Sequence, residues 1–272
     1  MRVRKPVVAC WVLRKGNYSV EERLASAAVL KGWGKECSIF EFIDSSTNGI
    51  DVDWKEGYGN LASKSFRGWQ YMFERYIKHS DGKYRVDFIL KADLDTYILW
   101  HNLRLYLDKF DPHKLYYIGK TLNTKNETFV AGACIILTRA SLGHFVSASK
   151  KAIGSCAREM FHRLSAEDVA LGRCLAELGI QPQVTQDDSG AERFMVFSPD
   201  FMLNGQNGKL PPWYISFSAN KILGKGCCSE EAIAFHYVRP ENQGRRLIFQ
   251  KGIWQFETQY WDYVKAIVPQ RP

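Results

Sequence analysis

Two acidic residues, Asp93 and Asp95, follow directly after a mostly apolar run at residues 86–90. The run predicts a buried strand, and ligands in α/β sheets bind beyond the carboxyl ends of the strands. Two carboxylates at such an edge can hold Mg²⁺ or Mn²⁺, which prefer oxygen ligands and would bridge the phosphates of a nucleotide. The structural alternative is a turn in which Asp95 caps the following helix. On the Asp-Leu-Asp triplet at residues 93–95 alone, both the metal site and the capping turn stay open.

A second candidate lies in the segment Ser-Ala-Glu-Asp-Val-Ala-Leu-Gly-Arg-Cys-Leu at residues 165–175. Ser165 and Asp168 fit a helix N-cap pair. The residues expected to be buried beneath them are Leu171, Cys174, Leu175 and Leu178. The positive end of a helix dipole keeps a carboxylate ionised, and an ionised carboxylate suits a general base. Asp168 is therefore a candidate base as well as a capping residue.

A third candidate, His236, stands between Phe235 and Tyr237 in an otherwise apolar stretch. A histidine among aromatic residues is more often a hydrogen-bonded core residue than a ligand. In isolation His236 is therefore not identified as a metal ligand.

Charge and composition narrow the function classes. The chain has 272 residues, 46% hydrophobic and 24% charged, with a formal charge of +8. A basic balance can indicate nucleic acid, an acidic membrane surface or a phosphate-bearing ligand. Because no run of five basic residues occurs, we interpret the charge as diffuse and expect no nucleic-acid partner. No stretch of 18 apolar residues occurs, so we expect a soluble protein or one whose N-terminal membrane anchor has been removed.

Cysteines and glycosylation motifs bear on the compartment. The seven cysteines are Cys10, Cys37, Cys134, Cys156, Cys174, Cys227 and Cys228. Six of them could pair in about fifteen ways, and none has a spacing typical of zinc ligands. Together with the sequons at Asn17 and Asn126, they favour a secretory lumen.

The elements that would position these residues alternate along the chain. Strands are predicted over residues 6–13, 37–43, 86–90, 116–119 and 129–137, and helices over about 19–32, 61–78 and 98–110. Alternating strands and helices predict an α/β fold with a mostly parallel sheet wrapped by helices. Without a linker or repeat, we expect one domain over residues 1–272, although the chain is loop-rich beyond residue 180.

Five segments, in this order, resemble the core 1 β1,3-galactosyltransferases of glycosyltransferase family 31. They are Ala-Cys-Trp-Val at 9–12, Lys-Gly-Trp-Gly-Lys-Glu-Cys at 31–37, Phe-Ile-Leu-Lys-Ala-Asp-Leu-Asp-Thr-Tyr at 88–97, Glu-Asp-Val-Ala-Leu-Gly-Arg-Cys at 167–174, and Cys-Cys-Ser at 227–229 followed by Phe-His-Tyr-Val at 235–238. The last two matches are the most specific, and the resemblance runs from residue 10 to about residue 240.

The resemblance implies a GT-A, Rossmann-like nucleotide-sugar fold, with residues 1–120 holding the nucleotide and 121–272 the donor sugar and acceptor. It implies Mn²⁺ bound by Asp95 and His236, and Asp168 as the base. The residues implied to contact the UDP part are Asp93, Trp33, Lys64 and Lys91. The implied donor and acceptor pocket comprises Gly132, Glu167, Trp213 and Tyr214. The implied disulfides are Cys10–Cys37, Cys156–Cys174 and Cys227–Cys228, leaving Cys134 as the odd thiol.

The activity so implied is inverting transfer of galactose from UDP-galactose, in β1,3 linkage, to GalNAc-α-Ser/Thr of a glycoprotein in the Golgi or ER lumen. A homodimer is a further possibility. The chain departs from the family pattern at Leu94, at residues 130–135 near the donor and at 213–217 near the acceptor. Two alternatives therefore stay open: a fringe-like β1,3-GlcNAc transfer or another donor or acceptor, and a non-catalytic chaperone. Retention of Asp93, Asp95, Asp168 and His236 favours the enzyme.

Overall fold

The structure, a computed structural model, describes residues 5–15, 19–47, 50, 57–78, 85–151, 156, 166–243, 245–250 and 253–256. Two residues singled out above, Asn17 and Ser165, lie outside this part of the chain.

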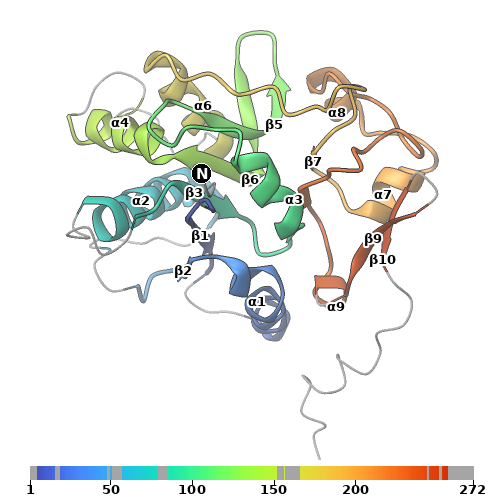
Figure 1. Ribbon diagram of the computed structural model, residues 1–272, viewed down its shortest axis with the longest axis horizontal. Coiled ribbons are helices and arrows are strands. Elements are labelled where there is room, and N and C mark those ends of the chain that lie inside the picture. The colour runs from blue at the N-terminus through green and yellow to red at the C-terminus, as the bar shows by residue number, and fades with distance from the viewer. Residues whose placement is uncertain are drawn as a thin grey trace, which may run out of the picture.

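A five-stranded sheet with the order β2-β1-β3-β6-β5 forms the centre of the fold (Figure 1). Its strands are β1 (Val8–Leu13), β2 (Ile39–Ile43), β3 (Phe88–Ala92), β5 (Tyr117–Asn123) and β6 (Thr128–Thr138). β1 pairs in parallel with both β2 and β3, as predicted, but β6 runs antiparallel to β3 and β5. The predicted α/β fold is confirmed, and its sheet is mixed because β6 alone runs against the other four strands. The reason is the short turn between β5 and β6, which can join only antiparallel strands.

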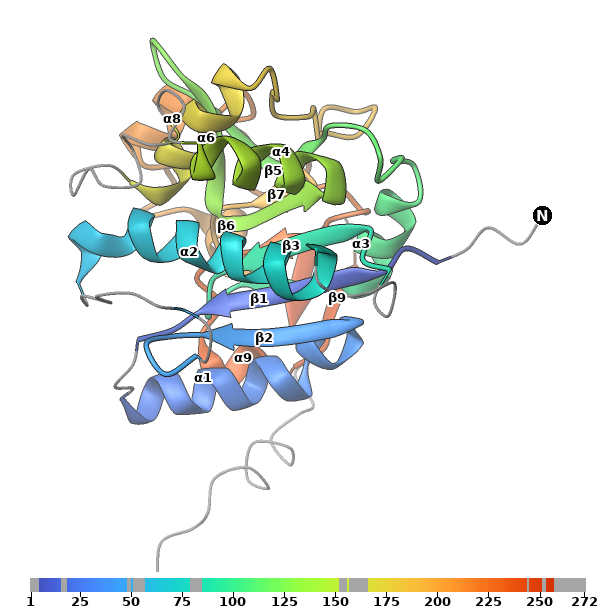
Figure 2. The ribbon, with the colours of Figure 1, turned by 90° about the vertical axis from the view of Figure 1, so that its left-hand side faces the viewer.

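Helices flank this sheet. The helix bounds are α1 (Val20–Lys31), α2 (Leu61–Phe73), α3 (Trp100–Leu107), α4 (Arg139–Lys150) and α6 (Glu167–Glu177). Alternate residues of a strand point to opposite faces. Ala9 and Trp11 pack with α2, α4 and α6, while Val8, Cys10 and Val12 pack with α1, α3 and the 3-10 helix η1 (Trp33–Glu36). Figure 2 shows α1 lying along the outer side of β2.

Local sequence signals explain several helix ends. Ser19 and Glu22 form a capping box at the start of α1, in which Ser19 Oγ accepts from the Glu22 amide at 3.1 Å. α2 begins at the predicted residue, but its last turn, Glu74–Lys78, is a π-helix. α4 was not predicted; Thr138 caps it by accepting from the Ser141 amide.

The last third of the chain, together with the short strand β4, forms a smaller layer beside the main sheet (Figure 1). Its three-stranded sheet has the order β4-β8-β7, with β4 (Tyr97–Ile98), β7 (Phe194–Met195) and β8 (Ala234–Phe235). The remaining elements are η2 (Tyr58–Asn60), α7 (Pro199–Asn204), α8 (Pro212–Phe217), α9 (Pro240–Gln243), and the hairpin of β9 (Leu247–Gln250) and β10 (Ile253–Phe256). Because β4 follows β3 after only four residues, this layer packs directly beside the carboxyl end of β3.

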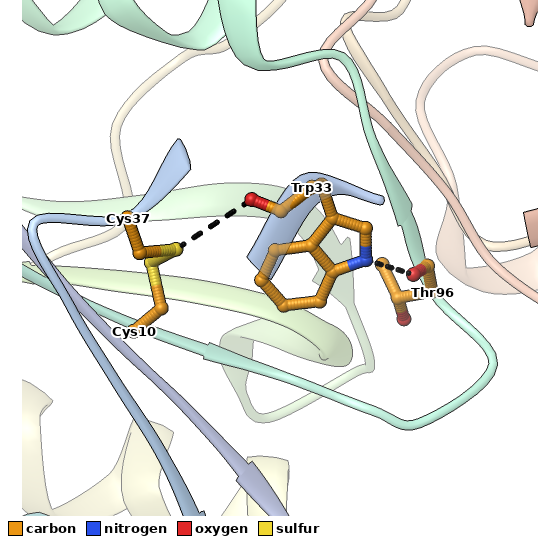
Figure 3. Close-up of a disulfide and its surroundings, with 4 residues drawn as sticks. All are labelled: Cys10, Trp33, Cys37 and Thr96. Atoms are coloured by element: carbon orange, nitrogen blue, oxygen red, sulfur yellow. Dashed lines mark hydrogen bonds between the residues drawn. A yellow bond between two sulfur atoms is a disulfide. The ribbon is translucent and has the colours of Figure 1, made fainter. Parts of the chain in front are cut away.

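The structure confirms the three disulfides that the family resemblance implied. Cys10 pairs with Cys37, Cys156 with Cys174, and Cys227 with its neighbour Cys228, while Cys134 is a buried free thiol. Figure 3 shows that the first bridge lies beside Trp33, whose carbonyl oxygen is 3.9 Å from Cys37 Sγ. Among the described residues, no helix is long and apolar enough to cross a bilayer.

Candidate metal and catalytic site

Asp93, Asp95 and His236 come together at the carboxyl end of β3. A tight turn, closed by the Thr96 amide donating to Asp93 O at 3.0 Å, presents the two aspartates. β4 then pairs antiparallel with β8, and the register Tyr97↔Phe235 brings the next residue of the chain, His236, opposite the turn. His236 Nε2 lies 3.0 Å from Asp95 Oδ1 and 3.4 Å from Asp93 Oδ2.

This geometry fits a divalent cation. Two ligand atoms at right angles around an ion, each about 2.1 Å away, are about 3.0 Å apart. The separations of 3.0 and 3.4 Å match adjacent ligand positions. The Asp93 and Asp95 side chains are 34% and 43% exposed, so phosphate oxygens or water could complete the shell. One imidazole and two carboxylates suit Mn²⁺ or Mg²⁺ better than a soft metal.

The site favours an ionised Asp95. Burial by itself would raise the pKa of Asp95, but the hydrogen bond and charge of His236 outweigh burial and lower that pKa. Asp95 is therefore a carboxylate at neutral pH, the form of this side chain that can ligate a cation.

A buried lysine connects the Asp93 carboxylate to helix α6. Lys91 lies on β3 with a side chain 1% exposed, and its Nζ donates to Asp93 Oδ1 at 2.7 Å and to Gly132 O at 3.0 Å. A third bond joins Nζ to Glu167 Oε1 at the start of α6. Burial would lower the pKa of Lys91, but Asp93 and Glu167 raise it, so the lysine is a cation.

The UDP contact that the resemblance implied for Lys91 stays a prediction. β3 alternates, so Lys91 points to the same face as Ile89, which packs against α2, α4 and α6. There the ammonium is surrounded by carboxylate and carbonyl oxygens of the protein. Its position is suited to holding other site residues in place, a role that the sequence did not indicate.

Asp168 stands in the first turn of α6, where the sequence placed it. Its Oδ2 accepts from the Gly132 amide at 3.1 Å, and its Oδ1 from the Val169 amide at 2.9 Å. Burial raises the pKa of Asp168 despite these two hydrogen bonds. The expectation that the helix end keeps this group ionised is thus incomplete, because burial acts in the opposite direction and is stronger. A raised pKa makes a carboxylate a stronger base.

Gly132 leaves the space in which Asp168 and Glu167 lie. A Cβ at this position would be 3.1 Å from Glu167 Oε1 and 3.7 Å from Asp168 Oδ2. The absence of a side chain here therefore allows β6 to approach the start of α6 closely.

Trp33 and Lys64, which the resemblance assigned to UDP, are both buried. Trp33 lies behind the turn that carries Asp93 and Asp95, and its indole N–H donates to Thr96 O at 3.0 Å (Figure 3). Lys64 lies on α2, on the side of the sheet that carries Lys91. Trp33 therefore supports the aspartate turn from the side of η1.

An aromatic row connects α8 to His236. Trp213 is 42% exposed and lies 5.7 Å from Phe197, while its neighbour Tyr214 is buried. Phe197 stacks at 6.4 Å on Tyr237, which stacks at 4.0 Å on His236. Tyr237 is 57% exposed with a backbone φ of 54°, a left-handed conformation that is strained for tyrosine. The sequence did not indicate that Phe197 and Tyr237 belong to this aromatic row. For Tyr237, its position next to His236 in the chain could have suggested the contact.

The chain is similar to known glycosyltransferases. No protein-family model matches the chain. The chain is 29% identical over 247 residues to glycoprotein-N-acetylgalactosamine 3-beta-galactosyltransferase 1 of Xenopus laevis, an alignment that covers 88% of this chain. The chain spans 64% of that relative's length.

Two solved structures are more distant. A glycosyltransferase involved in glycosylation of the major capsid of PBCV-1 shares 13% identity with a TM-score of 0.37, covering 54% of this chain and 69% of its own. The galactosyltransferase LgtC, solved with donor and acceptor sugar analogs, shares 13% identity with a TM-score of 0.42, covering 84% of this chain and 86% of its own. By sequence, the chain is similar over most of its length to a glycoprotein-N-acetylgalactosamine 3-beta-galactosyltransferase.

Proposed function

We propose that this protein is an inverting, divalent-metal-dependent glycosyltransferase of GT-A type that uses a UDP-sugar. The observation that carries the proposal is the convergence of Asp93, Asp95 and His236 at the end of β3, with Asp168 connected to them through Gly132 and Lys91. An ion-binding set connected to a half-buried carboxylate would supply both requirements of the reaction, stabilisation of a leaving diphosphate and a base.

Each residue has a defined task in this mechanism. Asp93, Asp95 and His236 would hold Mn²⁺, whose charge would stabilise the negative charge of a departing UDP. Asp168 accepts the proton of the acceptor hydroxyl as that oxygen bonds to the anomeric carbon. The bond from this carbon to the UDP oxygen breaks on the opposite face, so a single displacement inverts the linkage. The Gly132 and Val169 amides hold the Asp168 carboxylate while it takes the proton.

For the substrates, we propose galactose as the donor sugar and GalNAc-α-Ser/Thr of a glycoprotein as the acceptor, joined in β1,3 linkage. The similarity to a 3-beta-galactosyltransferase acting on glycoprotein N-acetylgalactosamine supports both. The partly exposed ring of Trp213, close to the row that ends at His236, offers a flat surface for an acceptor sugar. Three disulfides favour the oxidising lumen of the Golgi or ER.

The test is UDP release with Mn²⁺, offering UDP-galactose, UDP-GlcNAc and UDP-glucose in turn with a GalNAc-α-peptide. Asp168→Asn is the test variant, and Asp188→Asn, which changes an exposed loop carboxylate, is the matched control. Turnover with UDP-galactose that requires both Mn²⁺ and Asp168 is the expected result. Turnover with another donor would reassign the sugar. UDP binding without turnover would favour a non-catalytic role, and absence of UDP binding would refute the proposal.

A further inference from the structure

A second concave surface among the described residues, with a volume of about 1110 Å³, does not include the aspartates of the proposed metal site. It lies between the end of α1, helix α3 and the segment from α9 to β9. Lys5 precedes β1 and Lys35 precedes β2, so the cavity is at the amino ends of the parallel strands, whereas Asp93 follows the carboxyl end of β3. We call it the basic groove because its lining includes Lys5, Lys31, Lys35, Arg104, Arg245 and Arg246.

The charge of this groove is unbalanced. Against six basic residues, its lining has two acidic ones, Glu36 and Asp108. Lys31 and Lys35 are exposed and Arg104 is half-buried, and none of these three forms an ion pair within the described residues. Like charges gathered in a concave surface repel one another and focus the field, which favours an anionic occupant. From the sequence alone the positive charge was expected to be diffuse. The basic residues of the groove come from four separate segments of the chain, so no run of them is visible in the sequence.

Apolar surface accompanies the charge. Leu105, on α3, is 56% exposed and lines the groove. An occupant that offers only anionic groups would leave Leu105 without an apolar contact. One that offers both carboxylates and an apolar side chain would use both features.

We propose that the basic groove binds an acidic segment of a polypeptide. Its carboxylates pair with Lys31, Lys35 and Arg104, and an apolar side chain packs on Leu105. A groove is concave, so a flat membrane surface contacts only its rim, and a nucleic acid lacks the aliphatic group that Leu105 would contact. The groove is lined in part by Trp33 and Tyr97, which border the aspartate turn, but not by Asp93, Asp95, Asp168 or His236, and the proposal does not depend on the transferase activity.

The experiment measures binding of a fluorescent 12-residue peptide of alternating Glu and Leu by polarisation at low salt. A peptide with Gln in place of Glu, an oligonucleotide and vesicles of anionic lipid are the comparison probes. The test variant is Lys31→Glu/Lys35→Glu/Arg104→Glu. The control is Lys125→Glu/Lys221→Glu/Lys225→Glu, which makes the same charge change at exposed lysines outside the groove.

The expected result is binding of the acidic peptide that weakens by at least about tenfold in the groove variant and by less than about twofold in the control. Added salt should weaken it as well. Equal binding by the two variants, equal binding of the Gln peptide, or tighter binding of the oligonucleotide or vesicles would overturn the proposal. If the triple variant fails to fold by circular dichroism, the Lys31→Gln and Lys35→Gln single variants replace it, with losses of about two- to threefold each expected.

Discussion

Replacing Lys91 with methionine tests whether a buried cation holds the proposed site together. The change removes three hydrogen bonds and leaves Glu167, whose side chain is 8% exposed, without its cation. Asp93 is 34% exposed and can rehydrate, so most of the cost falls on Glu167. Removing one partner of a buried ion pair destabilises a protein by about 3–5 kcal/mol.

The assay is thermal unfolding without metal or nucleotide. For a chain of this size, about 3 kcal/mol corresponds to a fall in Tm of about 6–12 °C. The double variant Lys91→Met/Glu167→Leu should recover most of this loss, because it removes both charges. The matched control is Lys150→Met, which breaks a surface pair with Glu74 and should cost no more than about 1 kcal/mol.

Two results would refute this reasoning. A fall in Tm of less than about 2 °C for Lys91→Met would mean that water or another group replaces the ammonium. A double variant no more stable than the single one would mean that Glu167 does not depend on Lys91.

Three further outcomes are expected. Gly132→Ala places a Cβ 3.1 Å from Glu167 Oε1 and 3.7 Å from Asp168 Oδ2, so turnover should fall by at least about tenfold with UDP affinity little changed, measured by steady-state kinetics and calorimetry. Burial raises the pKa of Asp168 above its ordinary 3.8, so the folded state holds this proton more tightly than the unfolded state does. The resulting contribution to the free energy of unfolding is fully present below pH 3.8 and is lost as pH rises through the folded pKa. The free energy of unfolding of Asp168→Asn, measured relative to wild type, should therefore be higher at pH 7 than at pH 3.5. Denaturant titrations that give the same relative value at both pH values would contradict the shift. Asp95→Asn or His236→Ala should weaken Mn²⁺ binding by about 100-fold or more, seen as loss of the Mn²⁺-induced rise in Tm, whereas equal affinity would exclude the triad as the metal site.

The sequence by itself determined the features that depend on neighbouring residues. The apolar run of β1, the Ser19–Glu22 capping box and the position of Asp168 in the first turn of α6 follow from side chains within one turn or strand of each other. Asp93 and Asp95 could be recognised for the same reason, since they directly follow a buried strand.

Only the tertiary structure decided which distant residues meet. His236 reaches Asp95 because β4 and β8, more than 130 residues apart, pair in one particular register, and a slip of one residue would turn the histidine to the other face. Lys91 meets Glu167 because α6 packs across the face of the sheet to which alternate residues of β3 point. The gathering of Lys31 with Arg104 in one groove likewise depends on packing between separate segments. Chain spacing carries no information about such contacts, because packing and strand register select them.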